Sequence, residues 1–232
     1  MRRDDAEAFT LVGPPPLPAS AETVIDALSP LVTAQRLARI EEVVAGRTFG
    51  ITTILDNLAD PHNVAAILRS CEAFGIGRVN IISEHHAPSA AKQVAKGSHR
   101  WLDLAYYRQA MPCLHDAEQQ GYRLFVATMK GRYTPETLPM DRPVAIVLGN
   151  EHRGPSAQVC EHVTDSFAIP MQGFVESLNV SVAAAITLHR LRQRLVTQVP
   201  QQLSAQHLSL KARYLMHSVN DAAAILRSHI NA

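Results

Sequence analysis

Three polar side chains lie in one short stretch that is predicted to begin a helix: His62, Asn63 and Arg69. Asn63 falls in the first turn, beside backbone N–H groups that have no partner within the helix. Arg69 has alanines a turn before and a turn after it, so a substrate or a neighbouring chain can come close to its guanidinium. His62, seven residues earlier, lies near the same helical face. The alternative is that Arg69 pairs with Glu72 on a surface helix.

A second group of charged residues, Glu151 and Arg153, follows the apolar run at 144–148 and lies between Gly149 and Gly154. A glycine at the end of a buried strand lets a flat ligand lie against backbone amides. The spacing is not that of a phosphate-binding GxxxxGK[ST] loop, and no GxGxxG follows a first strand. A P-loop is therefore absent from the sequence, and a nicotinamide dehydrogenase has little support.

The stretch at 169–186 combines a strand end, a turn and a helix start. Pro170 ends a β-like run because it cannot donate to a sheet ladder, and Gly173 lets the backbone turn. Ser177 is expected to be the N-cap of a helix over 178–195. The first half of that helix is apolar almost all round, which predicts burial on most sides. The stretch is either a rigid ligand-binding loop or an ordinary strand-loop-helix crossover.

Strands and helices alternate from residue 51 onward, which predicts a mostly parallel α/β sheet covered on both faces. The expected strands are 51–56, 78–82, 102–106, 123–128, 144–148 and 166–169, and the expected helices are 61–74, 89–94, 111–120 and a short one after residue 154. Ligands gather at the carboxyl ends of strands in such sheets. The loops after Asp56, Thr128, Leu148 and Ile169 are therefore expected to build a site.

The chain is expected to have four parts. Residues 1–20 are proline-rich and predicted to be disordered, 21–50 form a helical extension of one or two amphipathic helices, 51–197 form the α/β domain, and 198–232 form a second helical extension. The last part carries an amphipathic pattern over 204–230, either unbroken or broken near Asn220.

Composition places the chain among ordinary globular proteins, with 232 residues, 47% hydrophobic, 19% charged and a net charge of +1. A bound polyanion would therefore need a local basic patch. Three widely separated cysteines without a CxxC pair fit a reducing compartment and predict neither a zinc site nor a disulfide framework. We expect a cytoplasmic protein with no membrane span and no metal.

Taken together and in this order, the three stretches resemble the motifs of the SpoU (TrmH-type) family of RNA ribose 2′-O-methyltransferases, part of the SPOUT superfamily. The first motif resembles residues 60–69 (DPHNVAAILR), the second 148–154 (LGNEHRG) and the third, which is the most specific, 169–183 (IPMQGFVESLNVSVA). The similarity runs over residues 36–194. It departs from the family at Pro155, where an apolar residue such as Leu or Ile is usual, so the start of the following helix is in question.

The resemblance implies a SPOUT-type, Rossmann-like fold with a C-terminal deep trefoil knot, S-adenosylmethionine bound in the knot loops, and a homodimer with the site near its interface. By match to the first motif it implies that Asn63 and Arg69 are catalytic. Polar residues of the other two motifs, implied to line the ribose and methyl-donor site, match Glu151, Ser177 and Asn179. The cofactor-binding positions that it implies are Thr128, Leu148, Gly149, Ile169, Met171 and Leu178.

The implied reaction moves a methyl group to a ribose 2′-hydroxyl, so some group must accept the hydroxyl proton. The family assigns this step to the arginine of the first motif, although a guanidinium with a pKa above ~12 is a poor base. Either Arg69 is deprotonated by its surroundings, or charged Arg69 grips an RNA phosphate that takes the proton. The second alternative needs less perturbation.

The short extensions at both ends resemble those of tRNA-acting members, which methylate a D-loop guanosine. Ribosomal RNA methylation and a non-catalytic RNA-binding paralogue of the same fold are the alternatives, and the intact motif residues argue against the second. Candidate phosphate contacts are Arg36, Arg39, Arg47, Arg100, Lys130, Arg132, Lys211 and Arg213.

Overall fold

The computed structural model describes residues 16–84, 98–195 and 203–230. The expected helix at 89–94 and most of the proline-rich start lie outside the described residues. The described residues divide into two compact units, one of residues 49–84 and 98–195 and one that combines residues 16–48 with 203–230. No helix in the described ranges is long and apolar enough to cross a membrane.

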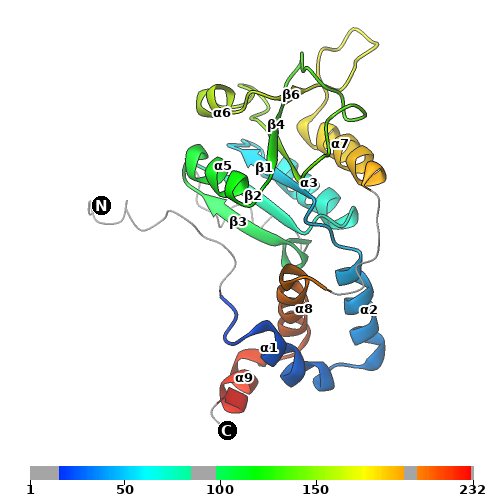
Figure 1. Ribbon diagram of the computed structural model, residues 1–232, viewed down its shortest axis with the longest axis vertical. Coiled ribbons are helices and arrows are strands. Elements are labelled where there is room, and N and C mark those ends of the chain that lie inside the picture. The colour runs from blue at the N-terminus through cyan, green and yellow to red at the C-terminus, as the bar shows by residue number, and fades with distance from the viewer. Residues whose placement is uncertain (1–15, 85–97, 196–202, 231–232) are drawn as a thin grey trace, which may run out of the picture. The chain divides into compact units, whose positions relative to one another are not determined.

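Within the described ranges, six parallel strands form the sheet of the first unit, in the order β3-β2-β1-β5-β4-β6 (Figure 1). The strands are β1 (Ile51–Asp56), β2 (Arg78–Ile82), β3 (Asp103–Tyr107), β4 (Arg123–Ala127), β5 (Val144–Leu148) and β6 (Ser166–Phe167). β1 and β5 are buried along their whole length, as parallel strands covered on both faces must be. The predicted parallel sheet is confirmed.

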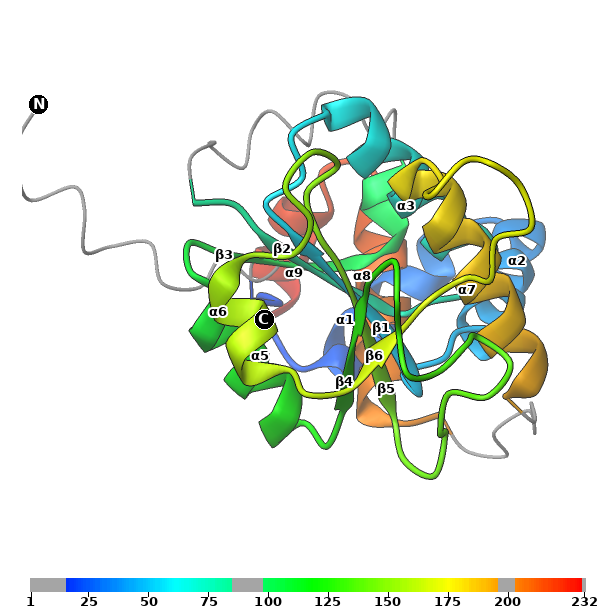
Figure 2. The ribbon, with the colours of Figure 1, turned by 90° about the horizontal axis from the view of Figure 1, so that it is seen from above.

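Helices cover both faces of this sheet (Figure 2). α3 (Pro61–Ala73) and α7 (Val180–Arg194) pack on one face, where their apolar side chains share a core with β1 and β5. α5 (Ala110–Gln119) and α6 (Ala157–His162) pack on the other face in a separate core. A single 3-10 turn, η3 (Ser98–Trp101), leads into β3. α6 begins at Ala157 despite the unusual Pro155 before it.

The local signals read from the sequence set the ends of α3. The Asp60 carboxylate accepts the N–H of His62 at 2.8 Å, and Pro61 is the first helical residue. Gly75 follows the helix with φ of 72°, a left-handed conformation that favours glycine. The helix begins at the predicted residue 61 and ends at Ala73, one residue before the predicted end, so Asn63 is fixed in the first turn.

The start of α7 differs from the prediction. Asn179, and not Ser177, is the N-cap, and its Oδ1 accepts the N–H of Ser181 at 2.8 Å. Asparagine caps a helix as well as serine does. The predicted burial of the first half is also wrong for one face, because Val182 is 45% exposed and Ile186 37% exposed. The opposite face of α7 packs on the sheet.

β6 is two residues shorter than predicted. It ends at Phe167, and the N–H of Ala168 donates to the carbonyl of Tyr133, in the loop after β4, at 2.9 Å. The segment from Ile169 to Asn179 belongs to no strand and forms one wall of the cavity described below.

The two helical extensions form one unit, which the sequence did not predict. Its elements are α1 (Ala21–Leu28), η2 (Ser29–Leu31), α2 (Ala34–Ala45), α8 (Ala205–Ser218) and α9 (Ala222–Ile230), and α8 packs against both α1 and α2. The break between α8 and α9 falls at Asp221, which has φ of 54°, next to the predicted Asn220. Arg47 is buried and donates its Nε to the Tyr214 hydroxyl at 3.1 Å, so the prediction that it contacts phosphate is wrong.

Candidate functional site

A cavity of about 810 Å³ lies where β1, β4, β5 and β6 end. The loops that follow these four strands line it, and they are the loops that strand polarity predicts. Residues from all three motif stretches meet there. The predicted site residues among its lining are Asn63, Thr128, Leu148, Gly149, Glu151, Ile169, Met171, Ser177, Leu178 and Asn179.

Arg69 is the predicted site residue that does not line this cavity. It follows Asn63 by six residues on α3, so the two side chains leave the helix about 240° apart. Its side chain is exposed and forms no hydrogen bond or ion pair, with Glu72 or any other residue, within the described part of the chain. The guanidinium is therefore available to a group outside this chain.

The Glu151 carboxylate is held by three N–H donors. It accepts the backbone N–H of Ala59 at 2.9 Å, the backbone N–H of Asp60 at 3.3 Å and the side-chain amide of Asn63 at 2.8 Å. Burial raises the pKa of Glu151, but hydrogen bonds from Asn63 and from the backbone outweigh burial, and the net pKa lies below its ordinary value. Glu151 is therefore ionised at neutral pH and is a poor proton acceptor.

The hydrogen bond between Asn63 and Glu151 continues to Asn179, which belongs to the third motif. Nδ2 of Asn179 donates to Oδ1 of Asn63 at 3.1 Å, and Oδ1 of Asn179 accepts both the N–H and the hydroxyl of Ser181, at 2.8 and 2.6 Å. The resulting chain of hydrogen bonds, Glu151–Asn63–Asn179, links three stretches that are far apart in the sequence. It fixes which way both amide groups face.

The loop after β5 is rigid for a reason that the sequence reading missed. Asn150 and Gly154 exchange both backbone hydrogen bonds, each at 2.9 Å, and the Asn150 side chain donates to the carbonyl of Asn57 at 2.7 Å. A Cβ on Gly149 would lie 2.2 Å from the backbone nitrogen of Pro155. Close packing of the backbone on itself therefore requires the glycine, where the sequence reading invoked a flat ligand.

Asp56 holds the far end of the same loop. This carboxylate, at the end of β1 and 1% exposed, accepts the backbone N–H of Ser156 at 2.6 Å. The sequence reading did not single out Asp56 or Asn150, although an aspartate that ends a buried strand was a signal for such a contact.

Two hydroxyl groups in the cavity wall lack partners. The side-chain oxygens of Thr128 and Thr187 are buried and have no hydrogen-bond partner in the described part of the chain. Thr187 was not predicted as a site residue. The feature that could have indicated it is a polar residue within the apolar part of α7. Buried hydroxyls without partners are rare, and a mostly apolar pocket with a few such groups is typical of a small-molecule site.

Comparison with known proteins supports the family resemblance that the sequence motifs indicate. The family model described as the SpoU rRNA Methylase family matches residues 50–189. The tRNA (guanosine(18)-2′-O)-methyltransferase of Thermus thermophilus is 33% identical over 169 residues, which are 70% of this chain and 85% of that protein. The 23S rRNA (guanosine-2′-O-)-methyltransferase RlmB of Haemophilus influenzae is 34% identical over 162 residues, 67% of this chain and 65% of that protein.

A solved structure supports the fold. The crystal structure of the A. aeolicus TrmH/SpoU tRNA modifying enzyme superposes with a TM-score of 0.70 at 24% identity and covers 80% of this chain and 97% of that one. The family match spans well over half of the chain and contains every residue that lines the cavity. The chain belongs to the SpoU methylase family.

Proposed function

We propose that this protein is an S-adenosylmethionine-dependent RNA ribose 2′-O-methyltransferase whose substrate is a guanosine in the D-loop of tRNA. The observation that carries the proposal is the hydrogen-bonded chain Glu151–Asn63–Asn179 at the wall of a cavity that also holds two buried, unpaired hydroxyls. The T. thermophilus relative, named for guanosine methylation in tRNA, supports the choice of substrate.

The cavity suits the proposed cofactor. S-adenosylmethionine, when bound, supplies a methyl group on a positively charged sulfur. The hydroxyls of Thr128 and Thr187 can form hydrogen bonds with its polar groups, and the Gly149 backbone lies at the same wall. Apolar surface for the rest of the cofactor comes from Leu148, Ile169, Met171 and Leu178.

Each polar residue of the site has a separate proposed role. Glu151 positions Asn63, and Asn63 and Asn179 in turn present fixed amide groups toward the ribose, beside the Ser177 hydroxyl. The proton of the 2′-hydroxyl does not go to Glu151, because the carboxylate already accepts three N–H groups and its pKa is lowered. We propose that it goes either to Arg69, deprotonated by its surroundings, or to an RNA phosphate gripped by charged Arg69.

A homodimer accounts for the position of Arg69. α3 and α7 pack side by side, and each exposes small or apolar residues: Ala66 and Ala73 flank Arg69 on α3, and Val182 and Ile186 lie on α7. Exposed apolar residues on adjacent helices are typical of a protein interface. A second copy on this face places Arg69 at the interface, within reach of RNA that the partner also contacts.

The path of the chain around β6 supports a trefoil knot. β6 pairs with β4 on one side and with Tyr133 on the other, so the loop 128–133 encloses it. A Cβ on Gly131 would lie 2.1 Å from the carbonyl carbon of Phe167, which measures how closely the loop passes. The Arg194 guanidinium also donates to the carbonyls of Pro135 and Leu138, both at 2.8 Å. We propose that this crossing belongs to the C-terminal deep knot of the SPOUT fold.

Exposed basic side chains near the cavity are available to bind the phosphates of the proposed RNA substrate. Lys130 and Arg132 are exposed in the loop after β4, and Arg153 is exposed at the cavity wall, so they are the proposed phosphate contacts nearest to the site.

The free cysteines Cys71 and Cys113 are buried as thiols, which supports a reducing, cytoplasmic location.

The test is transfer of tritiated methyl groups from S-adenosylmethionine to an unmodified tRNA transcript by the purified protein. We expect incorporation that disappears when the D-loop guanosines are replaced by adenosines. Incorporation only into 23S rRNA fragments would support the alternative represented by RlmB. Cofactor binding without transfer to either RNA would indicate a non-catalytic paralogue and overturn the proposal.

A further inference from the structure

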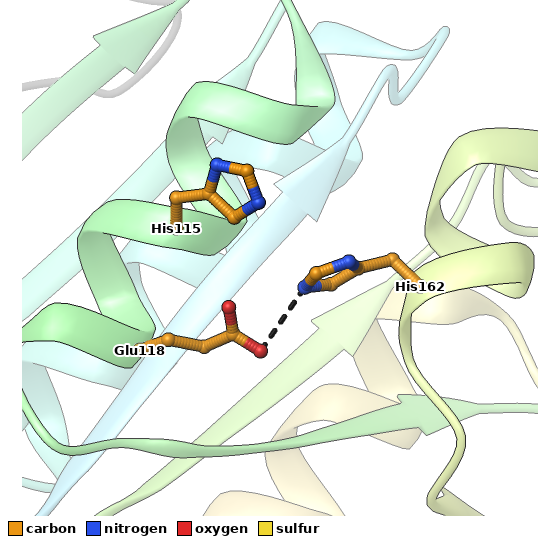
Figure 3. A group of neighbouring side chains, drawn as sticks. All are labelled: His115, Glu118 and His162. Atoms are coloured by element: carbon orange, nitrogen blue, oxygen red, sulfur yellow. Dashed lines mark hydrogen bonds and ion pairs between the residues drawn. The ribbon is translucent and has the colours of Figure 1, made fainter.

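Two histidines and one glutamate gather where α5 meets α6 (Figure 3). His115 and Glu118 lie three residues apart and so share a face of α5, and His162 is the last residue of α6. Nε2 of His162 lies 3.0 Å from Oε1 of Glu118. The rings of His115 and His162 have their centroids 5.3 Å apart at an interplanar angle of 69°. One nitrogen or oxygen from each residue lies within 4.8 Å of the other two.

This cluster is separate from the cavity, since none of its residues lines it. The hydrogen bond between Glu118 and His162 does not include His115, whose ring lies edge-on to the ring of His162. The ring nitrogens of His115 have no hydrogen-bond partner in the described residues. A cation shared by the three groups uses both imidazoles in their neutral form together with the carboxylate.

We propose that His115, Glu118 and His162 bind a divalent transition-metal ion of the Zn²⁺ class. Two imidazole nitrogens and one carboxylate oxygen suit Zn²⁺, whereas Mg²⁺ and Ca²⁺ prefer sets made only of oxygen. Ligand atoms about 2.0–2.2 Å from a tetrahedral zinc lie closer together than 4.8 Å, and the pair Glu118–His162 already lies within 3.0 Å. Binding therefore asks mainly for a rotation of His115, whose side chain is exposed. Water would take the fourth position.

The bound ion would tie α6 to α5. α6 has six residues and no side-chain cap, so little within the helix itself holds it. Its N-terminal end follows the loop 149–156 and is anchored by the contact between Ser156 and Asp56. An ion at His162 would anchor the other end. The site is therefore a structural one that steadies the connection to the loop carrying Glu151.

Zn²⁺ titrated calorimetrically into untagged protein tests the proposal. We expect one ion per chain, and weakening of binding by about tenfold or more in His115→Gln and in His162→Gln, because each loses one of three ligands. His229→Gln, which removes an exposed histidine of α9, is the matched control and should bind as the unaltered protein does. Absence of a saturable site in the unaltered protein would overturn the proposal.

His85 and His86, which are adjacent in the sequence, are a control for unspecific binding of the probe to histidines. A His85→Gln/His86→Gln double variant should retain the ion, and loss of binding there with retention in His115→Gln would also overturn the proposal. Co²⁺ gives a second readout, because its visible absorption reports a tetrahedral nitrogen and oxygen ligand set and should disappear in His162→Gln. Both titrations use neither RNA nor methyl donor, so they are independent of the proposed reaction.

Discussion

Glu151 shows how a carboxylate beside a reactive site can act without exchanging protons. Its two oxygens accept N–H groups from Ala59, Asp60 and Asn63, and these bonds lower its pKa although burial opposes them. A negative charge at the start of α3 also suits the positive end of the helix dipole. Its proposed role is to position Asn63.

Glu151→Gln should lower the free energy of unfolding by about 1–3 kcal/mol, because the new amide group faces donors and leaves them unsatisfied. The folded-state pKa of Glu151 is lowered, so its contribution is complete above the unfolded-state pKa of about 4.3 and is lost as pH falls through the folded-state value. Urea unfolding at several pH values should show the difference between the two proteins at neutral pH and its disappearance in acid.

Glu176→Gln is the control for this experiment, since Glu176 lines the same cavity and is exposed. Its stability should match that of the unaltered protein at every pH. An equal loss in both variants would show that the effect comes from net charge and not from the bonds to Glu151.

Arg69→Ala should reduce turnover by at least about 100-fold while stability changes by less than about 0.5 kcal/mol, because the side chain is exposed and unpaired among the described residues. Arg227→Ala removes a like charge from α9 and serves as the control in the same methyl-transfer assay. Arg69→Lys with native dimerisation and undiminished turnover would contradict both roles considered for this guanidinium.

At the scale of helices and strands, bounds set by local chemistry were predictable and bounds set by distant contacts were not. β1, β2 and β5 have their predicted ends: β5 is a continuous apolar run, and β1 and β2 are rich in β-branched residues. Ser177 and Asn179 can both cap a helix, and the choice between them depends on Asn63, more than a hundred residues away in the chain. The cluster of His115, Glu118 and His162 was likewise not predictable from the sequence, since 44 residues separate His162 from Glu118.

Asn179 joins the start of α7 to the polar chain of the site, and two substitutions separate these roles. Asn179→Ala should cost about 1 kcal/mol of stability through loss of the cap. Asn179→Asp keeps an acceptor for the Ser181 N–H and should retain most of that stability, but it loses the donor to Asn63. We expect both variants to lose turnover in the methyl-transfer assay.

Thermal unfolding measures the stability of both Asn179 variants, and the methyl-transfer assay measures their turnover. Full turnover in Asn179→Asp would show that the hydrogen bond to Asn63 is dispensable. Equal destabilisation in Asp and Ala variants would show that the residue does not act as a cap.

For the whole molecule, the exposed residues of α7 are the feature that a single chain leaves unexplained. Val182→Asp should convert the proposed homodimer into monomers, because a charge at a desolvated apolar interface costs several kcal/mol. Leu31→Asp, which alters an exposed apolar residue in the separate helical unit, should remain dimeric. Sedimentation equilibrium measures both, and a monomeric unaltered protein would contradict the proposed dimer.

The family was predictable from three short motifs, because each motif is both a backbone turn and a set of polar groups, and the α/β class was predictable from the alternation of strands and helices. The union of the two terminal extensions into one unit was not readable, since α1 and α8 meet only through tertiary packing. The cavity lies within the family match, so the proposed reaction draws its site residues from the first unit alone.

The most direct test of the account is mass-spectrometric mapping of ribose 2′-O-methyl groups in RNA from cells with this gene, without it, and with it carrying Asn63→Ala. The account predicts one methylated D-loop guanosine in tRNA that is lost in the second and third strains and returns when the unaltered gene is restored. An unchanged set of 2′-O-methyl groups in tRNA across all three strains would contradict it.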